Sequence, residues 1–194
     1  MESTGLFERI CTAKRNINLD TLREVISLAV EIAREGREGR KVGTMFIVSD
    51  EKKTLERSKC LILDPLQGHP EEKKYISDSN MRETVKELSQ LDGAFIVSDS
   101  GVVISACRYI NASSEGIEMP MGLGSRHMAA ASITKETNSV AVVVSETSVV
   151  RIVDDGEIVS EIIPELWLIR QSSLHLKGKY SEKTKEHMTV ISKD

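Results

Sequence analysis

The chain has 194 residues, of which 40% are hydrophobic, enough to build one sizeable core. Lysine and arginine number 26 against 30 aspartate and glutamate residues, which gives a formal net charge of −4 and no reason to expect non-specific nucleic-acid binding. No stretch approaches the roughly 18 apolar residues of a membrane span, and the N-terminus lacks the features of a signal peptide, so we expect a cytoplasmic protein without membrane association.

The first regular element predicted is an amphipathic helix. Apolar residues recur at helical spacing over residues 19–33, with Asn18 or Asp20 as a cap and Gly36 or Gly39 as a stop. Its apolar stripe is expected to face the core.

Two short β-rich runs follow, at residues 44–49 and 60–63, and the charged stretch 50–59 is predicted to connect them. Residues 64–79 are rich in proline, glycine, histidine and charge, which indicates a surface loop. A second helix is predicted over residues 82–91.

The rest of the chain predicts hairpins around one more helix. A loop over residues 111–123 leads to a helix that starts at Ser125 or Arg126. The strands predicted on either side of it span residues 94–97, 102–106, 139–144, 148–153 and 157–163. Turns at residues 98–101 and 154–156 would close two hairpins. The pattern predicts a single α/β domain with a central mixed sheet flanked by helices.

Gly124, Ser125, Arg126 and His127 form a polar turn that leads into this helix. The first free amides of a helix and its dipole favour an anion, and the arginine and histidine add charge to the first turn. The same residues also make an ordinary N-cap with surface side chains. The segment lacks the third glycine of a Rossmann fingerprint and the lysine of a Walker loop, so it is a candidate phosphate site that needs a partner elsewhere.

The candidate partner is Asp92-Gly93-Ala94, at the junction between a predicted helix and a predicted strand. A carboxylate followed by two small residues can hold a divalent cation against a polyphosphate. Because Asp-Gly is also the commonest turn dipeptide, this signal is weak alone.

Taken together, three segments resemble the diadenylate cyclase family. They are residues 91–94 (Leu-Asp-Gly-Ala), 124–127 (Gly-Ser-Arg-His) and 144–146 (Val-Ser-Glu). The family's catalytic domain, found in the DNA integrity scanning protein and in membrane-bound cyclases, carries Asp-Gly-Ala and Gly-Thr/Ser-Arg-His-Arg signatures in this order. The likeness covers about residues 41–163.

The resemblance implies a reaction in which two ATP molecules condense to cyclic di-AMP and two pyrophosphates, with a divalent metal ion, Mn²⁺ or Mg²⁺. Asp92 would bind the metal and act with Arg126 and His127 in catalysis. Ile110 falls where an apolar residue meets the adenine, and Glu146 matches an acidic position. The ATP-binding residues implied are Gly93, Ala94, Ile110, Gly124, Ser125, Arg126, His127, Ser145 and Glu146.

Met128 departs from the family signature, because many members carry a second arginine there. A lost charge-assisted contact is typically worth about 1.5–3 kcal/mol, which puts the rate in question. Together with Ser125 it resembles the form carried by archaeal members. Two other functions stay open: an ATP-binding regulatory module with weak or no turnover, and a metal-dependent nucleotide phosphohydrolase.

One site holding one ATP cannot close a symmetric ring, so the resemblance implies a homodimer or higher homo-oligomer with two sites facing each other. We expect residues 1–40 to form an N-terminal helical extension, 41–163 the catalytic domain, and 164–194 a partly flexible segment. Trp167 could stack on adenine, but an isolated tryptophan is more often a packing anchor, here for this last segment. From Gln171 onward the tail is expected to be weakly ordered or part of an interface. The three cysteines, Cys11, Cys60 and Cys107, are expected to be reduced packing residues.

Overall fold

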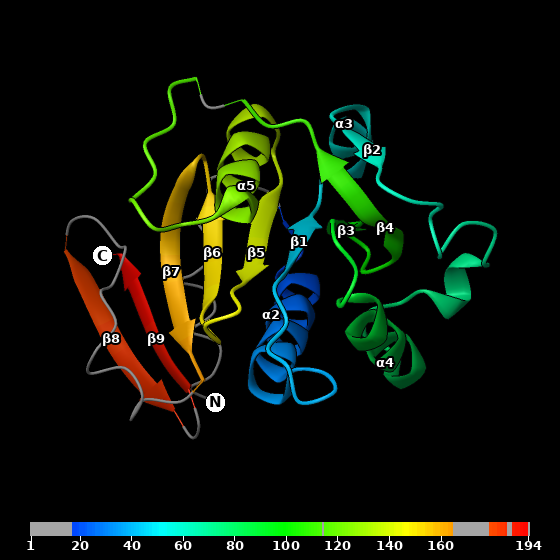
Figure 1. Ribbon diagram of the computed structural model, residues 1–194, viewed down its shortest axis with the longest axis horizontal. Helices are drawn as coiled ribbons and strands as arrows, with labels where there is room; N and C mark the ends of the chain where they lie inside the picture. The colour runs from blue at the N-terminus through cyan, green and yellow to red at the C-terminus, as the bar shows by residue number, and fades with distance from the viewer. Residues whose placement is uncertain (1–16, 114, 165–178, 186–187, 194) are drawn as a thin grey trace.

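The computed structural model describes residues 17–113, 115–164, 179–185 and 188–193, which form one mixed sheet with helices on both faces (Figure 1). At its centre, β1 (Thr44–Val48) pairs in parallel with β3 (Ala94–Val97) and antiparallel with β5 (Val140–Val144). The nine strands lie in the order β2-β4-β3-β1-β5-β6-β7-β9-β8, and the other neighbours are antiparallel. The predicted α/β class with a central mixed sheet is confirmed.

Both predicted hairpins are present, since β3 pairs with β4 and β6 pairs with β7. Their turns contain Gly101 (φ 87°) and Gly156 (φ 80°), in a backbone conformation that glycine adopts without steric cost. All five residues of β5 are buried, as expected for a strand covered on both faces. The strands not yet given are β2 (Ser58–Cys60), β4 (Val103–Ile110), β6 (Val150–Asp154), β7 (Glu157–Ile163), β8 (Tyr180–Lys185) and β9 (Met188–Lys193).

The N-terminal helix, α2 (Leu19–Glu35), has the predicted cap and stop. The Asn18 side chain accepts hydrogen bonds from the backbone amides of Asp20 and Thr21, and the helix ends at Gly36 (φ 61°). Its buried side chains join the same core as the sheet. Helix α2 therefore packs as part of the sheet domain, although it lies before residue 41.

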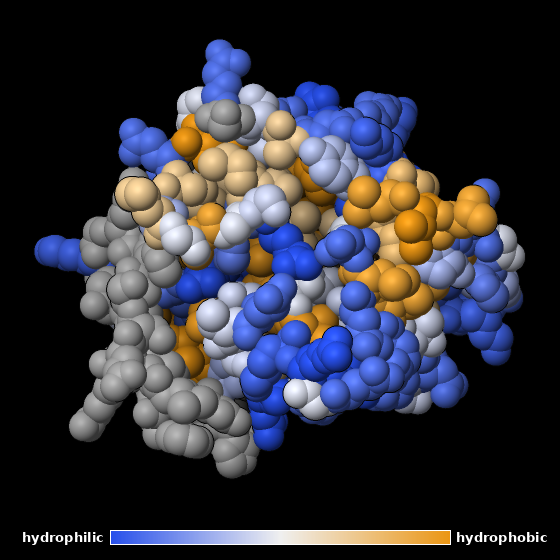
Figure 2. Space-filling view, viewed as in Figure 1, coloured by the Kyte–Doolittle hydropathy of each residue, from blue (hydrophilic) through white to orange (hydrophobic). Residues whose placement is uncertain are grey.

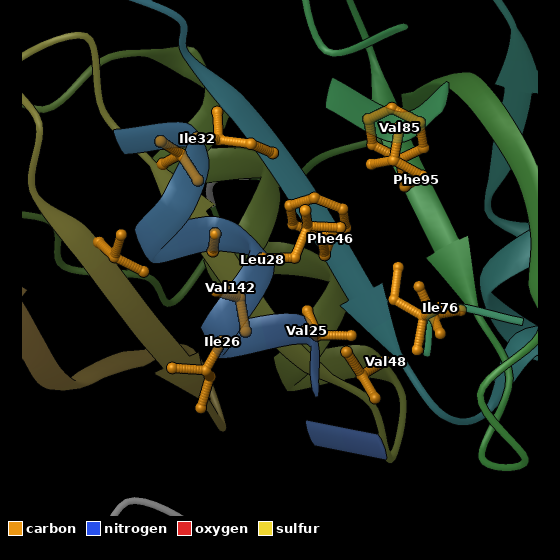
Figure 3. Packing of buried hydrophobic residues seen from close by; sticks show 14 of the residues in the cluster. Val25, Ile26, Leu28, Ile32, Phe46, Val48, Ile76, Val85, Phe95 and Val142 are labelled. Atoms are coloured by element: carbon orange, nitrogen blue, oxygen red, sulfur yellow. The ribbon is translucent and has the colours of Figure 1, made fainter. Parts of the chain in front are cut away.

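The sheet divides the core into two layers because neighbouring residues of a strand face opposite sides. Met45 lies in the layer under α5 (Ser125–Glu136), whereas Phe46 lies in the layer under α2. On the α2 side the rings of Phe46 and Phe95 stack with centroids 5.2 Å apart. Figure 3 shows this layer, to which α2, α4 and the sheet all contribute: Val25, Ile26, Leu28, Ile32, Phe46, Val48, Ile76, Val85, Phe95 and Val142.

The segment after β1 differs from the prediction. The expected connection over residues 50–59 contains a helix, α3 (Glu51–Glu56), and the strand expected over residues 60–63 is the edge strand β2, which ends at its first residue. The chain then leaves the sheet for the surface, where Leu63 is 91% exposed. Asp64 fixes this departure by accepting hydrogen bonds from β4, a long-range contact that hydrophobicity alone does not reveal.

The second helix begins and ends three residues earlier than predicted, as α4 (Ser79–Leu88). The Asp78 side chain caps it by accepting from the amides of Asn80 and Met81, and this N-cap signal outweighed the apolar spacing that placed it at residues 82–91. The loop before it holds one short 3₁₀ turn, η1 (Glu71–Lys73).

The C-terminal segment also differs from the prediction. Strands β8 and β9 form a hairpin that pairs with β7 and extends the sheet, so weak order from Gln171 onward is wrong for residues 180–185 and 188–193. Trp167 and Cys11 lie outside the described residues. Among the helices that the structure describes, none combines the length and apolar composition that crossing a bilayer requires.

Candidate functional site

Helix α5 begins at the predicted position, with Gly124 as its N-cap. Glycine offers no side chain to accept from the first backbone amides, and the structure records no side-chain cap here. The amide of His127 donates to the Gly124 carbonyl oxygen at 3.0 Å, so the amides of Ser125 and Arg126 are the ones available to an external acceptor. The expected anion-binding geometry of a helix N-terminus is present at Ser125 and Arg126.

Asp92 lies between α4 and β3, where the chain turns into the sheet, and its side chain is 88% exposed. The next residue, Gly93, has a φ of 109° and lies against β4. A Cβ atom there would meet the carbonyl carbon of Cys107 at 2.6 Å and the amide nitrogen of Arg108 at 2.7 Å. Glycine is required at this position by the close approach of two strands, in addition to any contact with a ligand.

Arg126 joins the three signature segments. Its Nη2 lies 3.2 Å from Asp92 Oδ1, and its Nη1 lies 3.3 Å from Glu146 Oε1. Gly43, just before β1, leaves room for this arrangement, because a Cβ atom there would be 2.7 Å from Arg126 Nη1. Residues 34 and 20 positions from Arg126 in sequence therefore meet at one guanidinium.

A cleft of about 550 Å³ opens beside this cluster. Six predicted residues line it: Asp92, Gly93, Ala94, Ile110, Ser125 and Arg126. Met128, the departure from the family signature, lines it too. The prediction missed Met45, Leu61, Arg108, Tyr109, Ala112 and Ala129. Figure 2 shows apolar surface gathered on the β2 and β4 side of this face, where Leu61 and Tyr109 are about half exposed.

Four predicted residues lie outside the cleft lining. Gly124 is the N-cap of α5, and Glu146 contacts the cleft-lining residue Arg126 through its carboxylate. The hydroxyl of Ser145 lies 2.9 Å from that of Thr147. The fourth residue, His127, is described next.

His127 was expected to bind ATP and to act in catalysis, but the structure places it on the inner face of α5. It is 6% exposed, and its Nε2 lies 3.3 Å from Nη1 of Arg151. Arg151 in turn donates through Nε to Glu161 at 2.6 Å, in a buried ion pair. Successive helix residues point about 100° apart. Because the Arg126 side chain faces the cleft, the side chain of His127 faces the sheet.

Asp92 is the only carboxylate among the residues lining the cleft. The described part of the chain contains no cluster of three or more histidine, cysteine, aspartate or glutamate side chains suited to a metal ion. Cys60 and Cys107 are free thiols, and Cys107 is buried as expected of a packing residue, whereas Cys60 is exposed. Burial, followed by the charge of Asp64, raises the pKa of Cys107. A smaller hollow of about 260 Å³, between residues 116–120 and the β6–β7 turn, contains none of the predicted site residues.

Comparison with known proteins gives a family for this chain. Residues 31–158 match the family model DAC, described as DisA bacterial checkpoint controller nucleotide-binding. A diadenylate cyclase from Methanocaldococcus jannaschii is 50% identical over 145 residues, which is 74% of this chain and 46% of that protein. One from Haloferax volcanii is 42% identical over 167 residues, which is 84% of this chain and 60% of that protein.

The chain thus spans about half the length of these curated relatives. Among solved structures, a hypothetical membrane spanning protein from Bacillus cereus superposes with a TM-score of 0.53 at 16% identity, over 72% of this chain and 62% of the other. That likeness concerns the fold alone. The family match covers most of the chain, including all three signature segments, and the chain therefore belongs to the DAC family.

Proposed function

We propose that this chain is a diadenylate cyclase that condenses two ATP molecules into cyclic di-AMP with release of two pyrophosphates. The observation that carries the proposal is the shared cleft. Asp92 and the start of α5 at Ser125 and Arg126 both line it, and the Asp92 carboxylate lies 3.2 Å from the Arg126 guanidinium. The names of the two archaeal relatives support the same activity.

In each half of the reaction a ribose 3′-oxygen forms a bond to the α-phosphorus of the other nucleotide. The bond from that phosphorus to the bridging oxygen breaks, pyrophosphate leaves, and the hydroxyl proton is released. Such reactions need chiefly positioning and donors aimed at the developing negative charge. The amides of Ser125 and Arg126 and the guanidinium of Arg126 supply those donors, and the guanidinium would exchange one of its two carboxylate partners for a phosphate oxygen as the nucleotide binds.

Asp92 is suited to a cation that arrives with the nucleotide. Mg²⁺ and Mn²⁺ prefer oxygen ligands and are commonly held by one or two carboxylates together with substrate phosphates. The single exposed carboxylate in the cleft fits that pattern better than a resident site with several protein ligands would. When bound, the cation would neutralise phosphate charge and lower the pKa of the attacking hydroxyl.

Two protomers are needed for the ring to close. The cleft of one chain contains a single pair of Asp92 and Arg126, whereas the product has two equivalent phosphodiester bonds. A two-fold axis that sets two clefts face to face supplies both. The 88% exposure of Asp92 leaves its carboxylate accessible to a ligand shared with a second copy.

The test is to incubate the purified chain with ATP and either Mg²⁺ or Mn²⁺ and to identify the products by mass. Cyclic di-AMP and pyrophosphate are expected, at a rate that rises more steeply than linearly with protein concentration below the dimer dissociation constant. ADP or AMP would instead indicate a phosphohydrolase. Bound but unchanged ATP would indicate a regulatory module, and either result overturns the proposal.

A further inference from the structure

Arg108 is a cation of the cleft wall whose role nothing above explains. It lies on β4, opposite Ala94 on one side and Cys60 on the other. The charged residues that line the cleft are Asp92, Arg108 and Arg126. Two carboxylates contact Arg126, but all the contacts of Arg108 are with neutral groups. A charge held without an acidic partner beside an open cleft is a candidate ligand-binding group.

The neutral acceptors hold the guanidinium by its edge. Nε donates to Ser58 Oγ at 3.1 Å, and Nη2 donates to the carbonyl oxygens of Ser58 at 2.9 Å and Leu55 at 3.3 Å. Nη1 donates to Cys60 Sγ at 2.9 Å. The five N–H groups of arginine lie in one plane, so these contacts fix the plane and use most of its edge. One N–H of Nη1 is left without an acceptor among the described residues, and the side chain lines the cleft.

The surroundings favour a base over a phosphate. Phosphate recognition by arginine uses two parallel N–H groups of the edge, and at Arg108 that edge is occupied by the end of α3 and by β2. The side chains of Leu61, Tyr109 and Ile110, which line the same cleft, are apolar or aromatic. Guanidinium planes stack on nucleobases in such settings.

We propose that Arg108 binds the base of the nucleotide by stacking its fixed guanidinium plane on the purine ring. The phosphates are then left to Ser125 and Arg126, on the helix side of the cleft. This inference rests on the proposed function only in taking the ligand to be a nucleotide.

The experiment measures equilibrium binding of adenosine, ATP and inorganic triphosphate, without divalent cations, to the wild-type chain and to Arg108→Ala and Arg108→Lys. Both variants should bind adenosine and ATP about tenfold more weakly, since base stacking accounts for a loss of that order, and should bind triphosphate as the wild type does. Lysine keeps the charge but lacks the plane. Unchanged adenosine binding, or weakened triphosphate binding that lysine restores, would overturn the inference.

Two controls accompany this experiment: the removal of a cation outside the cleft, and a measurement on the unsubstituted chain. Arg23→Ala removes a cation that pairs with Asp20 on α2, outside the cleft lining, and should alter none of the three affinities. In the wild-type chain, labelled with ¹⁵N-arginine, adenosine should shift the Nε–H resonance of Arg108 through the ring current of the base. A resonance that does not move would refute stacking even if both variants fail to fold.

The two proposals fail separately. Wild-type adenosine binding in Arg108→Lys, with cyclic di-AMP still formed by the parent chain, would overturn only the role of Arg108. Tenfold weaker adenosine binding in that variant, with no cyclic di-AMP formed by the parent chain, would overturn only the proposed reaction.

Discussion

Gly43→Ala is a substitution aimed at the placement of one guanidinium. The added Cβ would lie 2.7 Å from Arg126 Nη1 and 3.1 Å from Glu146 Cγ, closer than such atoms pack. Gly43 is not among the residues with positive φ, so alanine can adopt its backbone conformation. The contact is with the ends of two flexible side chains, so the substitution should move Arg126 and leave β1 in place.

The expected losses of stability and of rate in Gly43→Ala differ in size. Asp92 and Glu146 have side chains that are 88% and 68% exposed, and exposed ion pairs contribute at most about 1 kcal/mol each. Loss of both should lower the melting temperature by less than about 8 °C for a domain of this size. A displacement of about 1 Å in a catalytic group can reduce the rate roughly 100-fold. Activity should therefore fall far more than stability.

The assay is the rate of cyclic di-AMP formation, with the melting temperature measured in parallel. The matched control is the pair Arg126→Ala and Gly43→Ala/Arg126→Ala. If Gly43 acts only through Arg126, the second substitution adds no further loss of rate to the first. A wild-type rate in Gly43→Ala would refute the reasoning, because the position of Arg126 would then not matter. Additive losses would show that Gly43 acts on something else.

Three further substitutions test the site and its support. Asp92→Asn should abolish product formation while the melting temperature stays within about 4 °C of wild type, because the carboxylate is exposed; a normal rate would exclude a catalytic role. His127→Ala should cost about 1–3 kcal/mol of unfolding free energy in denaturant titration, because it removes a buried partner of Arg151; an unchanged stability with weaker triphosphate binding would restore the phosphate role. At Glu31, burial opposes ionisation, but hydrogen bonds led by that from Lys86 outweigh it and lower the pKa below its ordinary value of 4.5. The stabilisation is therefore present above pH 4.5 and lost as the pH falls through the lowered pKa. Glu31→Gln should flatten the decline of the melting temperature below that pH, and an unaltered decline would contradict the assignment.

Local patterns predicted most of the sheet because they have local causes. The turns at Gly101 and Gly156 need a backbone conformation that glycine favours, and the apolar runs beside them are long enough to be buried. The start of α5 was predicted from another local signal, the Gly-Ser N-cap, in which Gly124 keeps an ordinary extended backbone (φ −79°). Strands β8 and β9 were missed because their sequence is mostly polar and charged, and their pairing with β7 is a long-range contact.

At the site, the sequence predicted which segments meet but not how each side chain is used. One available signal would have placed His127 correctly: Ala130, Ala131 and Thr134 follow it at helical spacing, and all are buried. The role of Gly43 could not be predicted, because it depends on contact with a side chain 83 positions later in the sequence. Its partner there is Arg126. Arg108 was missed because its orientation is set by backbone carbonyls of α3 and β2.

The alternation along β1 separates the evolutionary constraints on adjacent positions. Met45 contributes to the wall of the cleft, while Phe46 beside it is enclosed on the other side of the sheet. Phe46 is not among the residues that line the cleft, so substitutions there are expected to act through the packing of the α2 side. A substitution at Met45 changes the cleft wall, and under the proposed function it would alter nucleotide specificity while the opposite layer stays packed.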